Sequence, residues 1–311
     1  MKSGFILAWI LSCLCATGCG PQPGPACLWG AFLADRPTGE AIERSAADHG
    51  KSPAIVLIFV GWGQFPDEAS VRDIYAAGSI PLVTWEPWYA DEKRGIDVDE
   101  VTSGRDDDYI REFARRLKKG GGPVLLRFAH EMNGDWYPWS AHTIGAERYR
   151  RLFIHVWEVF DQVPGEKVRW IFSINAENVP AQNTYEPCYP GDSFVDYIGL
   201  DGYNWGSVRP WSRWKSFQEI FSPVYHEVVK CFRKPVMITE FSSTSQGGDK
   251  AVWIEGALGT VRHMPQLKAV VLFDHDKETD WCFRPGTPEG VSLRAALAKG
   301  RFRGGPLEDL P

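Results

Sequence analysis

Eight short apolar segments recur along the chain with helical patterns between them, and this alternation constrains the fold more than any other feature. The segments lack polar alternation, which is typical of parallel strands buried on both faces. They cover residues 29–33, 54–60, 80–85, 123–128, 168–174, 197–201, 235–240 and 268–273. Capped helical patterns separate them. This order predicts an α/β protein with a single (β/α)8 TIM barrel; an open doubly wound sheet is the alternative.

The N-terminus has the pattern of an export signal. Lys2 precedes the apolar stretch GFILAWILSCLCATG, which is too short to span a membrane. The motif ATGC resembles a bacterial lipobox, in which Cys19 would be lipidated. We expect a cell-envelope lipoprotein, or otherwise a secreted protein. The expected parts are a signal peptide over 1–18, a linker over 19–28, the barrel over 29–303 and a tail over 304–311.

Composition excludes some partners and leaves one question open. The 311 residues carry a formal net charge of −6, so nothing indicates a nucleic-acid partner. We expect a monomer that meets a membrane only through the lipid anchor. The 14 Trp residues fit either core packing or platforms for sugar rings, and composition alone does not decide between them.

Four cysteines lie beyond the export segment: Cys27, Cys188, Cys231 and Cys282. Export permits disulfides. Cys188 precedes the sixth predicted strand and Cys231 the seventh, so we expect them to pair. The alternative is two unrelated buried thiols.

Active sites of (β/α)8 barrels form at the C-terminal ends of the strands. The polar and aromatic residues at those ends are therefore the candidates for chemistry and binding. They are Trp62, Trp85, Glu86, Trp88, Arg127, His130, Glu131, Asn133, Asn175, Asp201, Tyr203, Asn204, Trp205, Glu240, Phe273 and the segment DHDKETDW after the eighth strand.

Glu131 and Glu240 are the pair favoured by chemistry. They follow the fourth and seventh strands and should face each other across the mouth of the barrel. Two carboxyl groups across a sugar-sized cleft can divide the roles of acid and nucleophile. The structural alternative is an ion pair of one of them with Arg127 or Lys277. Rival carboxylates are Glu86, Asp201 and Asp274.

Other chemistries lack their motifs. The stretch HEMNG does not match H-E-x-x-H, because Gly134 stands where the second histidine is needed. No G-x-S-x-G motif occurs. The loop DHDKETD could hold a cation, but charged loops are usually solvated. We therefore expect no metal and no cofactor.

Four motifs together resemble glycoside hydrolase family 26 over about residues 29 to 300. They are RFAHEMNGDWYPWS, YPGDSFVDYIGLDGYNWG, VMITEFSS and FDHDKETDW. That family contains β-mannanases, mixed-linkage β-glucanases and some β-1,3-xylanases. The resemblance implies a (β/α)8 barrel that cleaves β-glycosidic bonds with retention of configuration.

The resemblance also implies roles for single residues. Glu131 matches the acid/base and Glu240 the nucleophile. His130 matches a histidine that orients catalytic groups, and Tyr203 a tyrosine that hydrogen-bonds the nucleophile. The supporting arginine is Arg127, and the aromatic residue on the leaving-group side is Trp136.

Burial among aromatic residues should hold Glu131 protonated near neutral pH. We expect Trp85, Trp88, Trp136 and Trp205 to line one groove. The wider substrate-binding set is Trp62, Trp85, Glu86, Trp88, Asn133, Trp136, Asp201, Trp205 and Phe273.

Two departures from the family pattern bear on the substrate. Members often carry Trp at the end of the eighth strand, where this chain has Phe273, and TWEPWY resembles the glucanase-type members. We expect a polysaccharide substrate, a β-1,4-containing glucan slightly ahead of mannan. A β-1,4-mannanase and a non-catalytic polysaccharide-binding or export-associated protein are the alternatives.

Overall fold

The computed structural model describes residues 26–165, 168–299 and 301–306. The expected signal peptide, Cys19, most of the expected linker and most of the expected tail lie outside the described residues. No helix within these described ranges is long and apolar enough to cross a membrane.

Eight parallel strands close into a barrel, which confirms the predicted fold. Neighbouring strands pair in chain order, and β10 pairs with β1 to complete the ring. The strands are β1 (Cys27–Phe32), β2 (Ile55–Gly61), β3 (Ile80–Glu86), β6 (Val124–Phe128), β7 (Val168–Asn175), β8 (Tyr197–Asn204), β9 (Val236–Ser243) and β10 (Leu267–Phe273). β1 begins two residues before the expected start of the barrel, and the short β11 (Phe302–Arg303) pairs with it.

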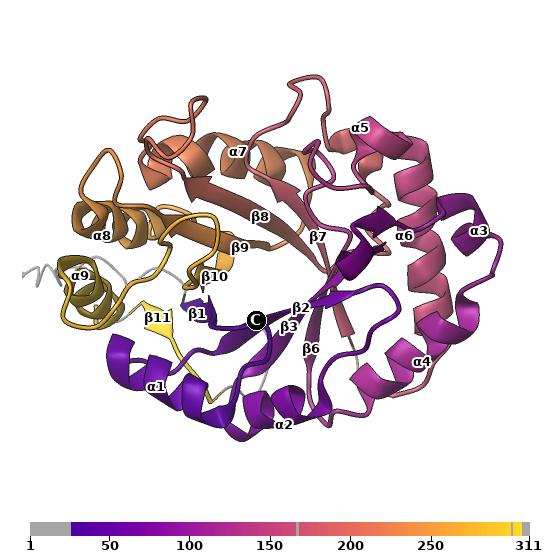
Figure 1. The fold of residues 1–311 in the computed structure, drawn as a ribbon, viewed down its shortest axis with the longest axis horizontal. Coiled ribbons are helices and arrows are strands. Elements are labelled where there is room, and N and C mark those ends of the chain that lie inside the picture. The colour runs from indigo at the N-terminus through magenta and orange to yellow at the C-terminus, as the bar shows by residue number, and fades with distance from the viewer. Residues whose placement is uncertain (1–25, 166–167, 300, 307–311) are drawn as a thin grey trace, which may run out of the picture.

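The helices lie around the outside of the strands (Figure 1). The larger ones are α1 (Gly39–His49), α2 (Glu68–Ala76), α4 (Asp107–Lys118), α6 (Ala146–Asp161), α7 (Phe217–Cys231), α8 (Lys250–Val261) and α9 (Pro288–Leu297). The shorter elements are α3 (Val98–Thr102), α5 (Ala141–Ile144) and the hairpin of β4 (Trp88–Tyr89) and β5 (Arg94–Gly95). The sequence pattern did not predict α9 or the hairpin.

Local sequence explains where the helices begin. Thr38 caps α1 and Asp67 caps α2, each by accepting a backbone N–H bond. The α7 helix begins directly after Ser216. Ser216 and Glu219 form a reciprocal capping box there.

Each strand is buried on both faces, as its apolar composition predicts. In β2, Ile55 and Leu57 belong to the cluster inside the barrel, while Val56 and Ile58 belong to the cluster between strands and helices. Side chains alternate between the two faces along a strand. The same alternation decides below which strand-end residues face the mouth of the barrel.

The predicted disulfide between Cys188 and Cys231 is wrong. All four cysteines among the described residues are free thiols. Cys188 is buried, whereas Cys231 is exposed at the end of α7. One thiol therefore lies in the interior and the other faces solvent, although both precede neighbouring strands.

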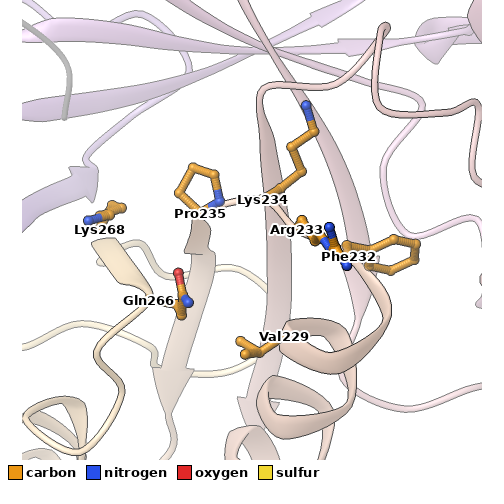
Figure 2. Close-up of a pocket in the computed structure, with 7 residues that line it drawn as sticks. All are labelled: Val229, Phe232, Arg233, Lys234, Pro235, Gln266 and Lys268. Atoms are coloured by element: carbon orange, nitrogen blue, oxygen red, sulfur yellow. The ribbon is translucent and has the colours of Figure 1, made fainter.

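A cavity of about 440 Å³ lies at the opposite end of the barrel from the candidate site (Figure 2). Its lining includes Pro235 and Gln266, which directly precede β9 and β10. In barrels of this kind, the end where the strands begin serves stability rather than chemistry. The candidate active site lies at the other end, where the strands finish.

Candidate active site

The chain leaving β6 holds Glu131 in an unusual backbone conformation. Ala129 and Glu131 have φ values of 50° and 53°, a region that costs a non-glycine residue about 1 kcal/mol or more. Two backbone bonds hold them there: the Ala129 N–H donates to the Trp85 carbonyl at 3.0 Å, and the Glu131 N–H to the Ser173 carbonyl at 2.9 Å. The neighbouring strands thus compensate for the strain and aim the Glu131 side chain.

Neutral donors surround the Glu131 carboxyl. The Asn175 side-chain amide donates to Oε1 at 2.8 Å, and the Trp136 indole N–H donates to Oε2 at 2.8 Å. Burial raises the pKa of Glu131, and the charges of Asp201 and Glu240 raise it further, while the two hydrogen bonds oppose the rise. The balance favours the protonated acid near neutral pH.

Glu240 is also buried, but a cation and a phenol surround it. It lies on β9, where the Arg127 guanidinium donates to Oε1 and the Tyr203 hydroxyl donates to Oε2. Both donors stabilise a carboxylate. Glu240 therefore has the surroundings of an ionised group, unlike Glu131.

Arg127 is held from below by a fully buried network. It donates to Asp201 at 2.7 Å and to Thr84 at 2.8 Å. Asp201 in turn accepts hydrogen bonds from Ser173 and Thr239 at 2.8 and 2.7 Å. The prediction that Asp201 binds substrate is therefore wrong: its side chain has no exposed surface, and it positions Arg127.

Asn133 is likewise a positioning residue, not the predicted substrate contact. It is completely buried. Its side chain donates to the Asn175 carbonyl at 2.9 Å and accepts the Asn175 N–H at 2.8 Å. Asn133 thereby orients the residue that holds Glu131.

His130 lies beside the acid as a neutral ring. Its ring packs 4.9 Å from Tyr137 and 5.8 Å from Trp139. Burial lowers the pKa of His130 well below its usual value, and the Arg127 and Lys277 charges lower it further. Its Nδ1 is buried and has no hydrogen-bond partner within the described part of the chain.

Glu86, at the end of β3, places a third carboxyl group near the pair. It accepts a hydrogen bond from the Trp88 indole at 3.0 Å. Burial raises the pKa of Glu86 to about 7, and the Glu240 charge adds to this effect. Lys277 lies nearby, 5.8 Å above the Phe273 ring and 3.3 Å from Glu278.

The predictions for Trp62 and Trp85 are wrong, because both belong to the core. Trp85 stacks on Phe113 at 3.9 Å, and Trp62 stacks on Trp85 at 5.0 Å. In β3, Thr84 bonds to Arg127 beneath the site, so the adjacent Trp85 must point outward toward the helices. Trp85 therefore cannot line the predicted substrate groove.

The remaining aromatic candidates differ in exposure. Trp136 is 44% exposed and bonds to Glu131, as a residue lining the cleft should. Trp88 and Trp205 are half-buried. Phe273 is almost completely buried against Phe32, at 4.6 Å, and contacts Tyr203 edge-on. It can therefore support Tyr203 but offers little surface to a ligand.

Sequence reasoning listed three further residues at the strand ends but gave them no role in the site. Asn175 ends β7 and bonds to Glu131. Lys277 and Trp281 lie in the segment DHDKETDW after β10, and no sequence signal shows that this segment packs against the site. Trp281 packs 5.0 Å from Tyr203. Among the described residues, no cluster of three or more His, Cys, Asp or Glu is placed to hold a metal ion.

Comparison with known proteins identifies the family to which this barrel belongs. A family profile described as glycosyl hydrolase family 26 matches residues 91–244. Endoglucanase H of Acetivibrio thermocellus is 36% identical over 281 residues, which is 87% of this chain and 30% of that protein. A mannan endo-1,4-beta-mannosidase of Bacillus subtilis is 27% identical over 146 residues, 45% of this chain and 36% of that protein. The chain thus spans about a third of the length of these relatives.

Solved structures show the same barrel. A Bacillus subtilis mannanase, man26, has a TM-score of 0.68 at 19% identity, covering 93% of this chain and 90% of that one. A modular endo-beta-1,4-mannanase from Cellulomonas fimi has a TM-score of 0.67 at 16% identity, covering 92% and 74%. At such identities the likeness shows the fold alone. Together with the family profile and the match to Endoglucanase H, it establishes that the chain belongs to glycoside hydrolase family 26.

Proposed function

We propose that the protein is a retaining endo-β-glycanase, with Glu131 as acid/base and Glu240 as nucleophile. The observation that carries this proposal is the difference between the two carboxyl groups: one is surrounded by neutral donors, the other by a guanidinium and a phenol. Paired carboxyl groups with such different surroundings are how glycosidases divide their two roles.

In the first step, Glu131 donates its proton to the glycosidic oxygen while a carboxylate oxygen of Glu240 attacks the anomeric carbon. The bond between that carbon and the glycosidic oxygen breaks, and the leaving sugar keeps the proton as its new hydroxyl. Forming the ester removes the charge of Glu240, which was one cause of the raised pKa of Glu131. Glu131 then ionises more readily.

In the second step, Glu131 acts as a base. It takes a proton from water, and the water oxygen attacks the anomeric carbon while the bond to Glu240 breaks. The product carries a new hydroxyl with the original configuration, and both carboxyl groups regain their starting states. The hydrogen bonds from Arg127 and Tyr203 stabilise the negative charge that returns to the Glu240 carboxylate.

For the substrate, we propose a β-1,4-containing glucan, including mixed-linkage glucan, ahead of mannan. Support comes from the breadth of the similarity: the match to Endoglucanase H covers 87% of the chain, whereas the match to the Bacillus subtilis mannosidase covers 45%. The TWEPWY segment, which spans the end of β3 and the start of the hairpin, resembles the glucanase-type members and supports the same choice. The mannan-named relatives and fold neighbours keep a β-1,4-mannanase as the second candidate.

The test is a panel of lichenan, barley β-glucan, carboxymethylcellulose, glucomannan and galactomannan, with Glu240→Gln as a matched inactive control. We expect the highest kcat/KM on a glucan, with viscosity falling faster than reducing ends appear, as internal cleavage requires. Proton NMR of early products should show the β-anomer first. Galactomannan as the best substrate would select the mannanase, and early α-anomer would exclude retention. Binding without turnover on every polysaccharide would select the non-catalytic alternative.

A further inference from the structure

Two tryptophans stand out as exposed large apolar side chains among the described residues. Trp136 is 44% exposed and Trp211 is 71% exposed; the other two such residues are valines on helices. An indole buries up to about 200 Å² when covered, so leaving one in water forgoes substantial stabilisation. Trp136 bonds to Glu131, which explains its exposure. Trp211 has no such explanation within the proposed mechanism.

Trp211 is connected to the nucleophile by a row of aromatic rings. Tyr203 donates to Glu240 and packs 6.4 Å from Trp205. Trp205 packs edge-on to Trp211 at 5.6 Å. The row therefore begins at the proposed nucleophile, which bonds the glycone, whereas Trp136 accompanies the proposed acid, which faces the leaving group.

The middle ring of the row, Trp205, is held by packing against a buried residue. Trp205 is half-buried and packs edge-on against the buried Trp281 at 5.0 Å. The Trp281 indole donates to Glu278 at 3.2 Å. The Arg209 guanidinium lies 5.6 Å from the centre of the Trp205 ring, so a cationic donor accompanies the aromatic surface.

The loop carrying Trp211 is a folded turn. The Ser212 hydroxyl donates to the Gly206 carbonyl at 2.8 Å and accepts the Arg209 N–H at 3.1 Å. The Ser207 N–H donates to the Gln246 carbonyl at 3.0 Å, which ties this loop to the one after β9. These bonds hold Trp211 in place before any ligand arrives, which lowers the entropic cost of binding.

From this geometry we infer that Trp205 and Trp211 form a distal glycone subsite, which binds β-linked pyranose units beyond the one attached to Glu240. The inference rests on the proposed function. One face of a β-linked pyranose presents C–H groups with partial positive charge, which complement the negative face of an indole. Arg209 supplies donors for the ring hydroxyls.

The test uses a series of aryl β-glycosides whose glycone grows from two to five sugars, so that only the glycone subsites vary. In the wild type, we expect kcat/KM to rise with glycone length. In Trp211→Ala we expect the gain from the longest glycones to fall about five- to tenfold, because one aromatic contact contributes about 1 kcal/mol. Trp211→Tyr, which keeps an aromatic face, should restore most of that gain. Val252→Ala, an exposed change on α8, is the matched surface control and should match wild type at every length.

Two kinetic outcomes would overturn the inference. One is an unchanged length dependence in Trp211→Ala. The other is an equal loss at every length, including the shortest, which would mean that the substitution only loosens Tyr203 and Glu240. Affinity electrophoresis through gels containing the soluble polysaccharide needs no turnover. Weaker retention of Trp211→Ala there supports the subsite even if the proposed hydrolysis fails, and retention equal to wild type contradicts it.

Discussion

The end of β6 and the end of β9 each carry one buried glutamate, but their surroundings have opposite effects. At β6, Glu131 meets an amide and an indole on a strained backbone, and burial favours its neutral form. At β9, Glu240 lies beside an irregularity in the strand register and meets Arg127 and Tyr203. Two identical side chains at one end of the barrel are thus surrounded by different hydrogen-bond donors, which suits the different roles proposed for them.

Removing the Glu240 carboxyl group at β9 should have the largest effect on catalytic activity. Glu240→Ala should lower kcat on polysaccharide by about 10⁴-fold or more, since the step that forms the covalent intermediate loses its nucleophile. Steady-state rates on the best substrate from the panel measure this. Activity within tenfold of wild type would show that another carboxylate, such as Glu86, is the nucleophile.

Removing the Glu131 carboxyl group after β6 should lower catalytic activity less, and by an amount that depends on the substrate. Glu131→Ala should lower kcat/KM on polysaccharide by about 10²- to 10⁴-fold, but far less on aryl glycosides with acidic leaving groups, which need little protonation. Azide should restore turnover of those glycosides, because it attacks the intermediate without a base. The product should be a glycosyl azide of retained configuration, identified by NMR. A loss independent of the leaving group would contradict the acid role.

The comparison also predicts opposite effects on stability. Because the pKa of Glu131 is raised on folding, the folded state holds its proton at pH values where the unfolded chain has released it, and stability falls with rising pH in that window. Glu131→Gln should therefore raise the free energy of unfolding by about 1 to 3 kcal/mol at pH 7 but hardly at pH 4.

Glu240→Gln is the matched control for that measurement. It leaves the buried Arg127 with one carboxylate partner instead of two, so it should destabilise the fold at pH 7. Urea titrations of both variants at the two pH values give the comparison. A stabilisation of Glu131→Gln that is equal at pH 4 and pH 7 would rule out the ionisation as its cause.

The smallest predicted effect is a shift in the alkaline limb of the pH profile of kcat/KM. Trp136→Phe keeps an aromatic ring but removes the indole N–H bond that lowers the pKa of Glu131. The pKa of the acid should rise, so the alkaline limb of kcat/KM should move to higher pH, by less than about one unit. Trp88→Phe, which loses a bond to Glu86 instead, should leave that limb in place. A shift to lower pH in Trp136→Phe would contradict the assignment.

The sequence by itself determined the barrel and the positions of its two candidate carboxyl groups. Eight apolar segments without polar alternation are sufficient to predict strands buried on both faces, and all eight match strands of the barrel. Since residues at the C-terminal ends of parallel strands meet at one mouth, Glu131 and Glu240 could be placed there from the chain alone, and the resemblance to the family favoured them over Glu86, Asp201 and Asp274.

Only the tertiary structure decided which neighbours face the site. Trp85 and Glu86 are adjacent in sequence, yet one lies in the outer core and the other near Glu240, because alternation sends them to opposite faces. Asp201 was predicted to bind substrate because it lies at a strand end. Its buried side chain instead accepts a hydrogen bond from Arg127. The row of Trp205, Trp211 and Trp281 joins two loops distant in sequence. Strand positions follow from local composition, but the surroundings of each side chain depend on packing between distant segments, which no local pattern encodes.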